Sequence, residues 1–279
     1  MKHYAAAFIA MVPMISILAA TPAEKSAEAA ARQYVEAADK GNVTAAYAML
    51  PKSYQQDVST VVSTFGKTMD EDIWNQAKGL VAALADIGVA KPQLVAQMMG
   101  KNGSAAAPTT EAIASVEKSA IALKALAGKL TLDMLKTGEI TKIIAMPEFS
   151  SIGEFSKAVN NDMAGGSVLG AKELEDGSVN ISFKDKKGVE EESPFVQVEG
   201  AWVPKEMADG WKEGVNGALK AVGQMKFDAA KKQQILGALP MIKMGIENAK
   251  NATSKEQLGQ SMMMAVMPFM MMGIGQGEM

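Results

Sequence analysis

The spacing of hydrophobic residues changes along this 279-residue chain, and the change limits the folds that it can adopt. Between residues 22 and 137 apolar side chains recur at helical spacing, as in Tyr54, Val58 and Phe65. Between 167 and 204 they alternate with polar residues, and after Glu206 the helical spacing returns. We therefore predict an α+β fold that is mostly helical: a helical block packed on a small antiparallel β-meander, followed by C-terminal helices.

Dipeptides that end in glycine mark the turns of this predicted meander. They are Asp176-Gly177, Lys187-Gly188 and Glu199-Gly200, and each separates two alternating runs. Such dipeptides are strong local signals for β-hairpins, and they predict three or four antiparallel strands. We also predict a strand over Glu139–Met146 and a short helix over Pro147–Asn161.

The first 20 residues have the layout of a secretory signal peptide. Lys2 precedes an apolar run over Ala5–Ala20, and small residues follow it. The run is shorter than the roughly 20 residues that a membrane-spanning helix needs. We predict cleavage after Ala20 or Ala23, and a periplasmic or extracellular protein with no transmembrane helix in the mature chain. An uncleaved anchor or a buried core helix is the alternative.

The residue inventory excludes several classes of activity. The chain has no Cys, its only His is His3, and Arg32 is its only Arg. The chain therefore lacks the residues that catalytic triads, Cys–His dyads and Cys/His zinc sites require. The net charge of −3 and the scarcity of Arg also argue against nucleic acid as a partner.

Acidic residues are the remaining source of catalytic chemistry. A pair of carboxylates could serve a hydrolase, although nothing in the sequence marks which two. The acidic runs Asp70–Asp72 and Glu190–Glu192 lack the alternating ligands and sharp glycine turn of a calcium loop. We interpret the first run as surface charge at a helix start and the second as the solvated face of a hairpin.

Two segments resemble a known superfamily. They are Ala30–Val58 (AARQYVEAADKGNVTAAYAMLPKSYQQDV) and Ser193–Glu206 (SPFVQVEGAWVPKE). The chain resembles the cone-shaped domains related to nuclear transport factor 2, especially secreted bacterial members with no assigned activity. The resemblance implies a helical hairpin across a bent sheet, with a pocket at the wide end and Trp202 on the family's last strand. Helical insertions depart from that pattern, and no catalytic residue carries over.

Methionine is the one unusual component of the composition. Of 22 methionines, eight lie in the last 18 residues. Thioether sulfur can bind Cu(I) or Ag(I), and Met263, Met267 and Met270 or Met271 would share a helical face. Methionine also packs adaptably against cores and partners. Because the run is apolar and has no His, we favour packing or partner binding over metal.

These observations predict four regions: a signal peptide (1–20), a helical region (21–137), a β-meander region that completes a cone-like domain (138–205), and C-terminal helices with a Met-rich tail (206–279). We expect a non-catalytic secreted protein, without a cofactor, that binds a partner protein or a small apolar ligand. A carboxylate-only hydrolase of envelope polymers and a soft-metal binder are the alternatives. The candidate contact residues are Tyr54, Trp74, Trp202, Met263, Met267 and Met271.

Overall fold

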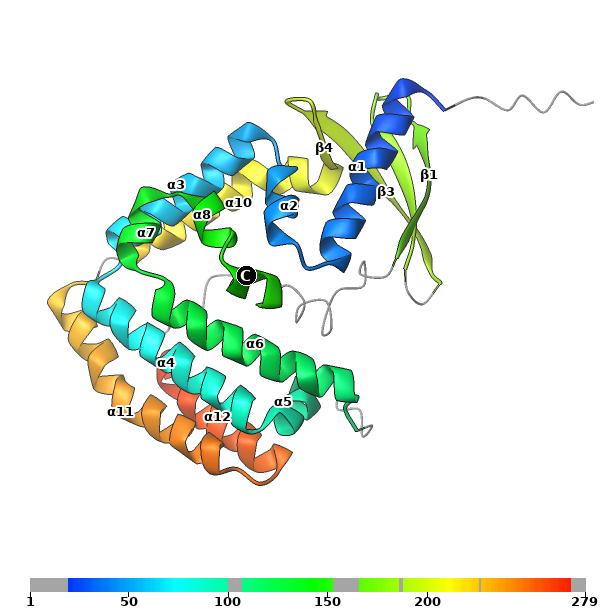
Figure 1. Cartoon of the computed structure of the whole chain (residues 1–279). Helices are drawn as coiled ribbons and strands as arrows, with labels where there is room; N and C mark the ends of the chain where they lie inside the picture. The colour runs from blue at the N-terminus through cyan, green and yellow to red at the C-terminus, as the bar shows by residue number, and fades with distance from the viewer. Residues whose placement is uncertain (1–19, 100–106, 153–165, 186–187, 226, 272–279) are drawn as a thin grey trace, which may run out of the picture.

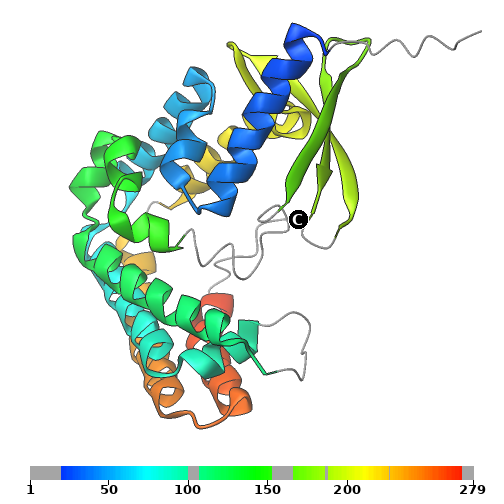
Figure 2. The same cartoon turned by 45° about the vertical axis from the view of Figure 1, so that its right-hand side comes forward.

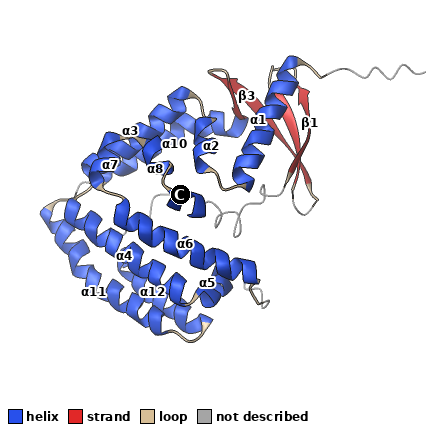
Figure 3. Ribbon diagram, in the orientation of Figure 1, coloured by secondary structure: helices blue, strands red, loops and turns tan. Residues whose placement is uncertain are grey.

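The fold combines many helices with one small sheet, as the sequence predicts (Figure 3). The computed structural model describes residues 20–99, 107–152, 166–185, 188–225 and 227–271. The predicted signal peptide, apart from Ala20, lies outside the described residues. The described elements pack in two groups, which we call the α+β lobe and the helical bundle (Figures 1 and 2).

The α+β lobe contains the sheet and the helices that pack around it. Four antiparallel strands pair in the order β1-β2-β3-β4, and helix α1 lies across one face of the sheet (Figure 1). Helices α3 and α10 pack against each other beside the sheet. The elements of this lobe are α1 (Pro22–Asp39), α2 (Val43–Ala48), α3 (Lys52–Thr68), α7 (Leu132–Thr137), α8 (Ile140–Ile144), β1 (Ser167–Glu173), β2 (Val179–Lys184), β3 (Glu190–Val198), β4 (Ala201–Pro204) and α10 (Lys205–Gln224).

The predicted hairpin turns are confirmed. Gly177, Gly188 and Gly200 all have φ between 81° and 85°, in the left-handed region that only glycine adopts without strain. In the first turn, the Asp176 carboxylate accepts hydrogen bonds from the backbone N–H and the hydroxyl of Ser178. Because each turn is specified locally, the meander forms with four strands.

Small residues on α1 allow the helix to lie close to the sheet. Ala27 and Ala31 are fully buried against the sheet residues Val179, Ile181 and Phe195. Large sheet side chains thus fill the space that the alanines leave, which is how a helix and a sheet reach core packing density. This cluster is the hydrophobic core of the α+β lobe.

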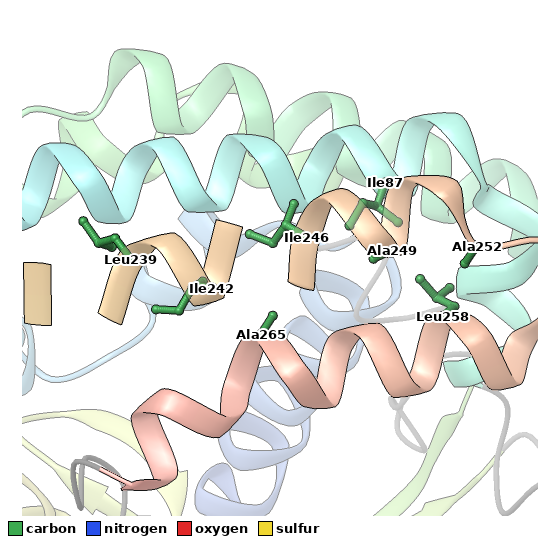
Figure 4. Close-up of a cluster of buried hydrophobic side chains, with 8 residues drawn as sticks. All are labelled: Ile87, Leu239, Ile242, Ile246, Ala249, Ala252, Leu258 and Ala265. Atoms are coloured by element: carbon green, nitrogen blue, oxygen red, sulfur yellow. The ribbon is translucent and has the colours of Figure 1, made fainter. Parts of the chain in front are cut away.

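The helical bundle joins two stretches of chain that are far apart in sequence. Helices α4, α5 and α6 come from the middle of the chain, and α11 and α12 come from its end. Side chains of α4, α11 and α12 meet in one buried cluster, which Figure 4 shows. The buried residues of this cluster are Ile87, Leu239, Ile242, Ile246, Ala249, Ala252, Leu258 and Ala265. The helices of the bundle are α4 (Glu71–Ala90), α5 (Pro92–Met99), α6 (Thr110–Lys129), α11 (Ala229–Asn251) and α12 (Lys255–Met271).

A third cluster lies where the two groups meet. Leu132, Leu135 and Ile143 are its buried members, and Phe65 at the end of α3 packs edge-on against Trp74 near the start of α4. The ring centroids of that pair are 6.0 Å apart. The α+β lobe and the bundle are therefore joined through packed aromatic and aliphatic side chains.

The predicted strand over Glu139–Met146 is wrong, because this segment forms helix α8. Ile140 and Ile143 are both buried, and a spacing of three residues puts them on one helical face. Gly138 ends α7 with φ 67°, and its carbonyl accepts a hydrogen bond from the Ser59 hydroxyl at 2.6 Å. Ile143 packs with Leu132 and Leu135 of α7, and helix α8 also contacts α3.

The helix predicted over Pro147–Asn161 is helical through residues 147–152, and the remainder falls outside the described residues. Across the described ranges, no single helix has both the length and the apolar character that a membrane crossing requires. Helices α4 and α5 meet that test of length and composition only when taken together, and they are bent by 100° at their junction.

Candidate functional site: an apolar cavity in the helical bundle

A cavity of about 370 Å³ lies inside the bundle, between α4, α5, α6 and α12. Its size is within the range of about 300–1,000 Å³ that small-molecule sites occupy. Leu84 and Ile87 of α4 line one side, and Leu258 and Met262 of α12 line another. Leu258 is almost completely buried, so the cavity lies beside the core cluster of the bundle.

The bend between α4 and α5 creates one wall of the cavity. Helix α4 stops because Lys91 leaves the helical conformation, with φ −138° and ψ 52°, and Pro92 begins α5. The Lys91 ammonium donates a hydrogen bond to the carbonyl of Ala252 at 2.6 Å, which ties the bend to the end of α11. Helix α5 then directs Val95 and Met98 toward the cavity.

The opposite wall depends on small residues where α4 meets α6. A side-chain carbon built on Gly88 would lie 2.7 Å from the Cβ atom of Ala120, closer than real Cβ contacts. Gly88 therefore lets the two helices approach, and Ala120 leaves space that a larger side chain would fill. Both residues line the cavity, together with Val116 from the same face of α6.

The lining carries almost no polar chemistry. Among the described lining residues Ser119 is the only polar side chain, and its hydroxyl donates to the carbonyl of Ser151 at 3.1 Å. No charged residue of the described chain lines the cavity. Met99 and Leu123, which also line it, are 38% and 36% exposed, so the cavity reaches the surface beside them. A site of this kind attracts an apolar molecule and offers it no reactive group.

Two further hollows lie in the α+β lobe. A groove of about 440 Å³ runs between α3 and α10, lined by Val58, Val61 and Met207 among others. A cavity of about 510 Å³ lies between α1 and the sheet, with Phe183 and Phe195 among its apolar lining residues and several carboxylates on its rim. Neither hollow is as uniformly apolar as the bundle cavity.

The buried carboxyl group of Glu148 has the wrong environment for a general acid. Its residue is only 9% exposed, and the Lys129 ammonium lies 2.5 Å from its Oε1 atom. The hydrogen bond from Lys129 lowers the pKa of Glu148, although burial opposes this shift. A glycosidase acid instead needs a raised pKa.

No group of three or more His, Cys, Asp or Glu residues converges on a metal-sized site within the described chain.

The acidic run at residues 70–72 marks the start of a helix, as predicted. The Asp70 carboxylate accepts hydrogen bonds from the backbone N–H groups of Asp72 and Ile73 and so caps α4. Lys232 of α11 contacts the carboxylates of both Asp70 and Asp72. The run therefore stabilises the bundle and holds no arrangement suited to calcium.

The aromatic candidates from the sequence are dispersed over the molecule. Tyr54 is 7% exposed and stacks on Trp211 with ring centroids 4.0 Å apart, within the contact of α3 and α10. Trp74 packs at the junction of the two groups and lines a hollow of about 190 Å³ between α4 and α6. Trp202 is 8% exposed in the core below α1, where its indole N–H donates to the Ser26 hydroxyl at 2.9 Å.

The methionine candidates lie on α12. Met263 and Met267 are 57% and 47% exposed on its outer side. Met271 is the last helical residue, and its side chain is outside the described part of the chain. The structure therefore does not bring the six predicted residues together.

Sequence reasoning missed the residues that line the bundle cavity. The signal that pointed to them is the composition of α4, whose second half (Leu80–Ala90) has only Asp86 as a charged residue. A helix that is apolar on nearly all faces is surrounded by other elements. The sequence does not show how α5 and α6 fold back on α4, and α12 lies more than 150 residues further along the chain. The cavity that these helices enclose could therefore not be predicted.

Comparison of this chain with protein-family models, with curated proteins and with solved structures finds no match.

Proposed function

We propose that this protein is an exported, non-catalytic binding protein, and that its helical bundle holds a small apolar ligand. The observation that carries this proposal is the cavity of about 370 Å³ among α4, α5, α6 and α12, whose described lining has no charged side chain. The ligand class is a molecule, or a part of a molecule, made mainly of hydrocarbon.

The hydrophobic effect supplies the affinity in this proposal. Burying apolar surface contributes about 25 cal/mol per Å² removed from water. A ligand in the cavity would be surrounded by aliphatic and thioether side chains such as Leu84, Val95 and Met262. A charged group on the ligand would have to stay at the mouth, near Met99 and Leu123, because the interior offers no partner for it.

The α+β lobe supports the proposed relation to the cone-shaped superfamily. Helix α1 crosses one face of an antiparallel sheet, as one helix of the implied hairpin would. The proposed ligand site, however, lies in the added bundle. Export rests on the composition of residues 1–20, and Pro22 begins α1 directly after that segment.

The test is saturable binding of N-phenyl-1-naphthylamine, a neutral fluorescent probe, to the chain that begins at Thr21. The variant Val95→Phe adds volume to the cavity lining, and we expect it to weaken probe binding at least tenfold. Val89→Phe is the matched control, because Val89 lies on α4, is 36% exposed and does not line the cavity. This control should bind the probe as the parent chain does.

Equal binding by both variants, or no saturable binding to the parent chain, would overturn the proposal. Circular dichroism melting checks that Val95→Phe still folds. If it does not, Met98→Trp provides a second test, because Met98 lines the cavity and is 37% exposed.

A further inference from the structure

A second hollow follows the bundle cavity along the contact between α4 and α6. It has a volume of about 190 Å³, and Trp74 and Lys78 of α4 are among the residues that line it. Leu123 of α6 lines both this hollow and the bundle cavity. The two spaces therefore meet at one side chain, which lies at the exposed mouth of the bundle cavity.

The spacing along the two helices puts both spaces on the same side of the seam between them. On α4, Lys78 lines the second hollow and Ala85, seven residues later, lines the bundle cavity. Seven residues are close to two helical turns, so these two side chains share a face. On α6, which runs beside α4 (Figure 1), Ser119 and Leu126 have the same relation. The hollows thus follow one another along one seam.

The ammonium group of Lys78 has no partner within the described part of the chain, where it forms no hydrogen bond and no ion pair. None of the residues one helical turn away from it is acidic; they are Trp74, Asn75, Val81 and Ala82. The side chain of Lys78 is half-buried and is the only charged one among the described residues that line this hollow. An uncompensated positive charge beside apolar surface favours an anionic group as its partner.

The indole N–H of Trp74 is a second group without a partner. Its nitrogen is buried and has no hydrogen-bond acceptor among the described residues. The other two tryptophans of the chain differ, because the indole N–H groups of Trp202 and Trp211 each donate to a side-chain oxygen at 2.9 Å. Trp74 and Lys78 are four residues apart and therefore neighbours on α4. Two donors without acceptors thus lie together beside the mouth of an apolar cavity.

We infer that the ligand of the bundle is a single hydrocarbon chain that ends in a carboxylate, which is the anion of a fatty acid. This inference rests on the proposed function and adds the charge and position of the head group. The hydrocarbon chain fills the bundle cavity, and the carboxylate passes Leu123 and accepts hydrogen bonds from Lys78 and Trp74. A carboxylate has two oxygen atoms and can therefore satisfy both donors. A hydrogen bond between an ammonium group and a carboxylate is also stronger than one between neutral groups.

The length of the seam agrees with such a ligand. Lys78 and Gly88 are ten residues apart on α4, which at about 1.5 Å per residue is roughly 15 Å. The hydrocarbon core of a bilayer is about 30 Å thick and holds two acyl chains end to end, so one chain spans about 15 Å. A fatty acid thus reaches from Lys78 to the place where Gly88 meets Ala120 and the two helices close together.

The test compares laurate with dodecanol, which has the same number of carbon atoms and no charge, by calorimetric titration of the delipidated chain that begins at Thr21. At neutral pH we expect laurate to bind at least about tenfold more tightly. Lys78→Met removes the charge and keeps most of the side-chain length, so it should abolish this preference and leave the affinity for dodecanol unchanged. Lys124→Met is the matched control and should keep the preference, because Lys124 is paired with Asp86 and lines neither hollow.

The indole resonance of Trp74 provides a measurement that needs no variant. In ¹H–¹⁵N spectra, saturating laurate should shift the Trp74 indole signal downfield, because its N–H gains an acceptor. The indole signals of Trp202 and Trp211, which already have acceptors, should stay in place. This measurement decides the question if Lys78→Met does not fold.

The inference would be overturned by laurate that binds no more tightly than dodecanol, by a preference that Lys78→Met retains or Lys124→Met loses, or by an unchanged Trp74 signal. In each of these cases the uncharged probe N-phenyl-1-naphthylamine still binds if the proposed function is right, so the two failures are distinguishable. If the probe, dodecanol and laurate all fail to bind, the proposed function fails and this inference fails with it.

Discussion

At the scale of single residues, glycines decide how closely the helices pack. A Cβ atom on Gly66 would lie 2.6 Å from the backbone nitrogen of Lys136, and Gly88 and Gly245 are equally crowded by Ala120 and Ala265. Gly79 and Gly237 also lie within helices, and nothing lies within 4 Å of the corresponding position. Some helical glycines thus allow a close contact between two helices, whereas others face open space. The sequence does not distinguish the two kinds of glycine, because the difference depends on whether another helix lies opposite. Substitution by alanine tests which kind a given glycine is. Replacing Gly245 by Ala should destabilise the protein by about 1–3 kcal/mol, because the added methyl group overlaps the α12 backbone. Replacing Gly237 by Ala on the same helix should instead stabilise it by about 0.5–1 kcal/mol, because Ala is the better helix former and the site is open. Urea unfolding followed by circular dichroism measures both. Effects of the same sign would contradict the assigned packing of α11 on α12.

At the scale of elements, an ionic contact joins the start of α4 to the start of α11. The Lys232 ammonium lies 3.0 Å from a carboxylate oxygen of Asp70 and 2.6 Å from one of Asp72. The hydrogen bond from Lys232, with backbone N–H donors, lowers the pKa of Asp70 below its ordinary value of 3.8, and the contacts with Asp72 and Asp70 raise the pKa of Lys232 above 10.5. Folding therefore favours the charged form of both groups. For Asp70 this stabilisation is complete above the unfolded pKa and is lost as the pH falls through the lower folded pKa. For Lys232 it is lost as the pH rises through the raised folded pKa. We predict that Asp70→Asn lowers the melting temperature at pH 7 and that the difference from the parent chain narrows below about pH 3.8. Thermal melts between pH 2.5 and 7 measure it; a difference that stays constant over that range would be inconsistent with this contact. Asp133→Asn is the comparison, because Asp133 is an exposed residue whose contact with Lys136 stays within one short helix. The elements that the sequence predicted correctly have local causes. Glycine turns specified the hairpins, and the acidic run marked the start of α4. The segment over 139–146 was mistaken for a strand because its β-branched residues fit both structures, and its burial against α3 and α7 decided for the helix.

At the scale of the whole molecule, the bundle is built from two segments that are distant in sequence. The sheet lies in the other group, the α+β lobe. The sequence indicated the helices of both segments, but not that they pack on each other or enclose a cavity. Lys91 and Ala252, for example, are hydrogen-bonded although they are 161 residues apart. We predict that deleting residues 262–279 loosens the bundle first, because it removes Ala265 and Met262 from the surface of α11 and from the cavity wall. The melting temperature should fall, and hydrogen exchange should quicken at the amides of α4 and α11 while β2 and β3 stay protected. The sheet amides are the internal control. Equal loss of protection in strands and helices would mean that the two groups unfold as a single unit.

The contact between α4 and α11 can form only late in the synthesis of the chain. A ribosome makes α4 long before α11 exists, so Ile87 has no Ile242 or Ile246 to pack against until the chain is almost finished. Contacts between residues so distant in sequence form slowly, because a long loop must close first. Until α11 and α12 have been synthesised, α4 therefore lacks the helices that bury its apolar face. Under the export that we propose for this protein, this delay would keep the segments of the bundle unfolded, which is the form that a membrane channel accepts.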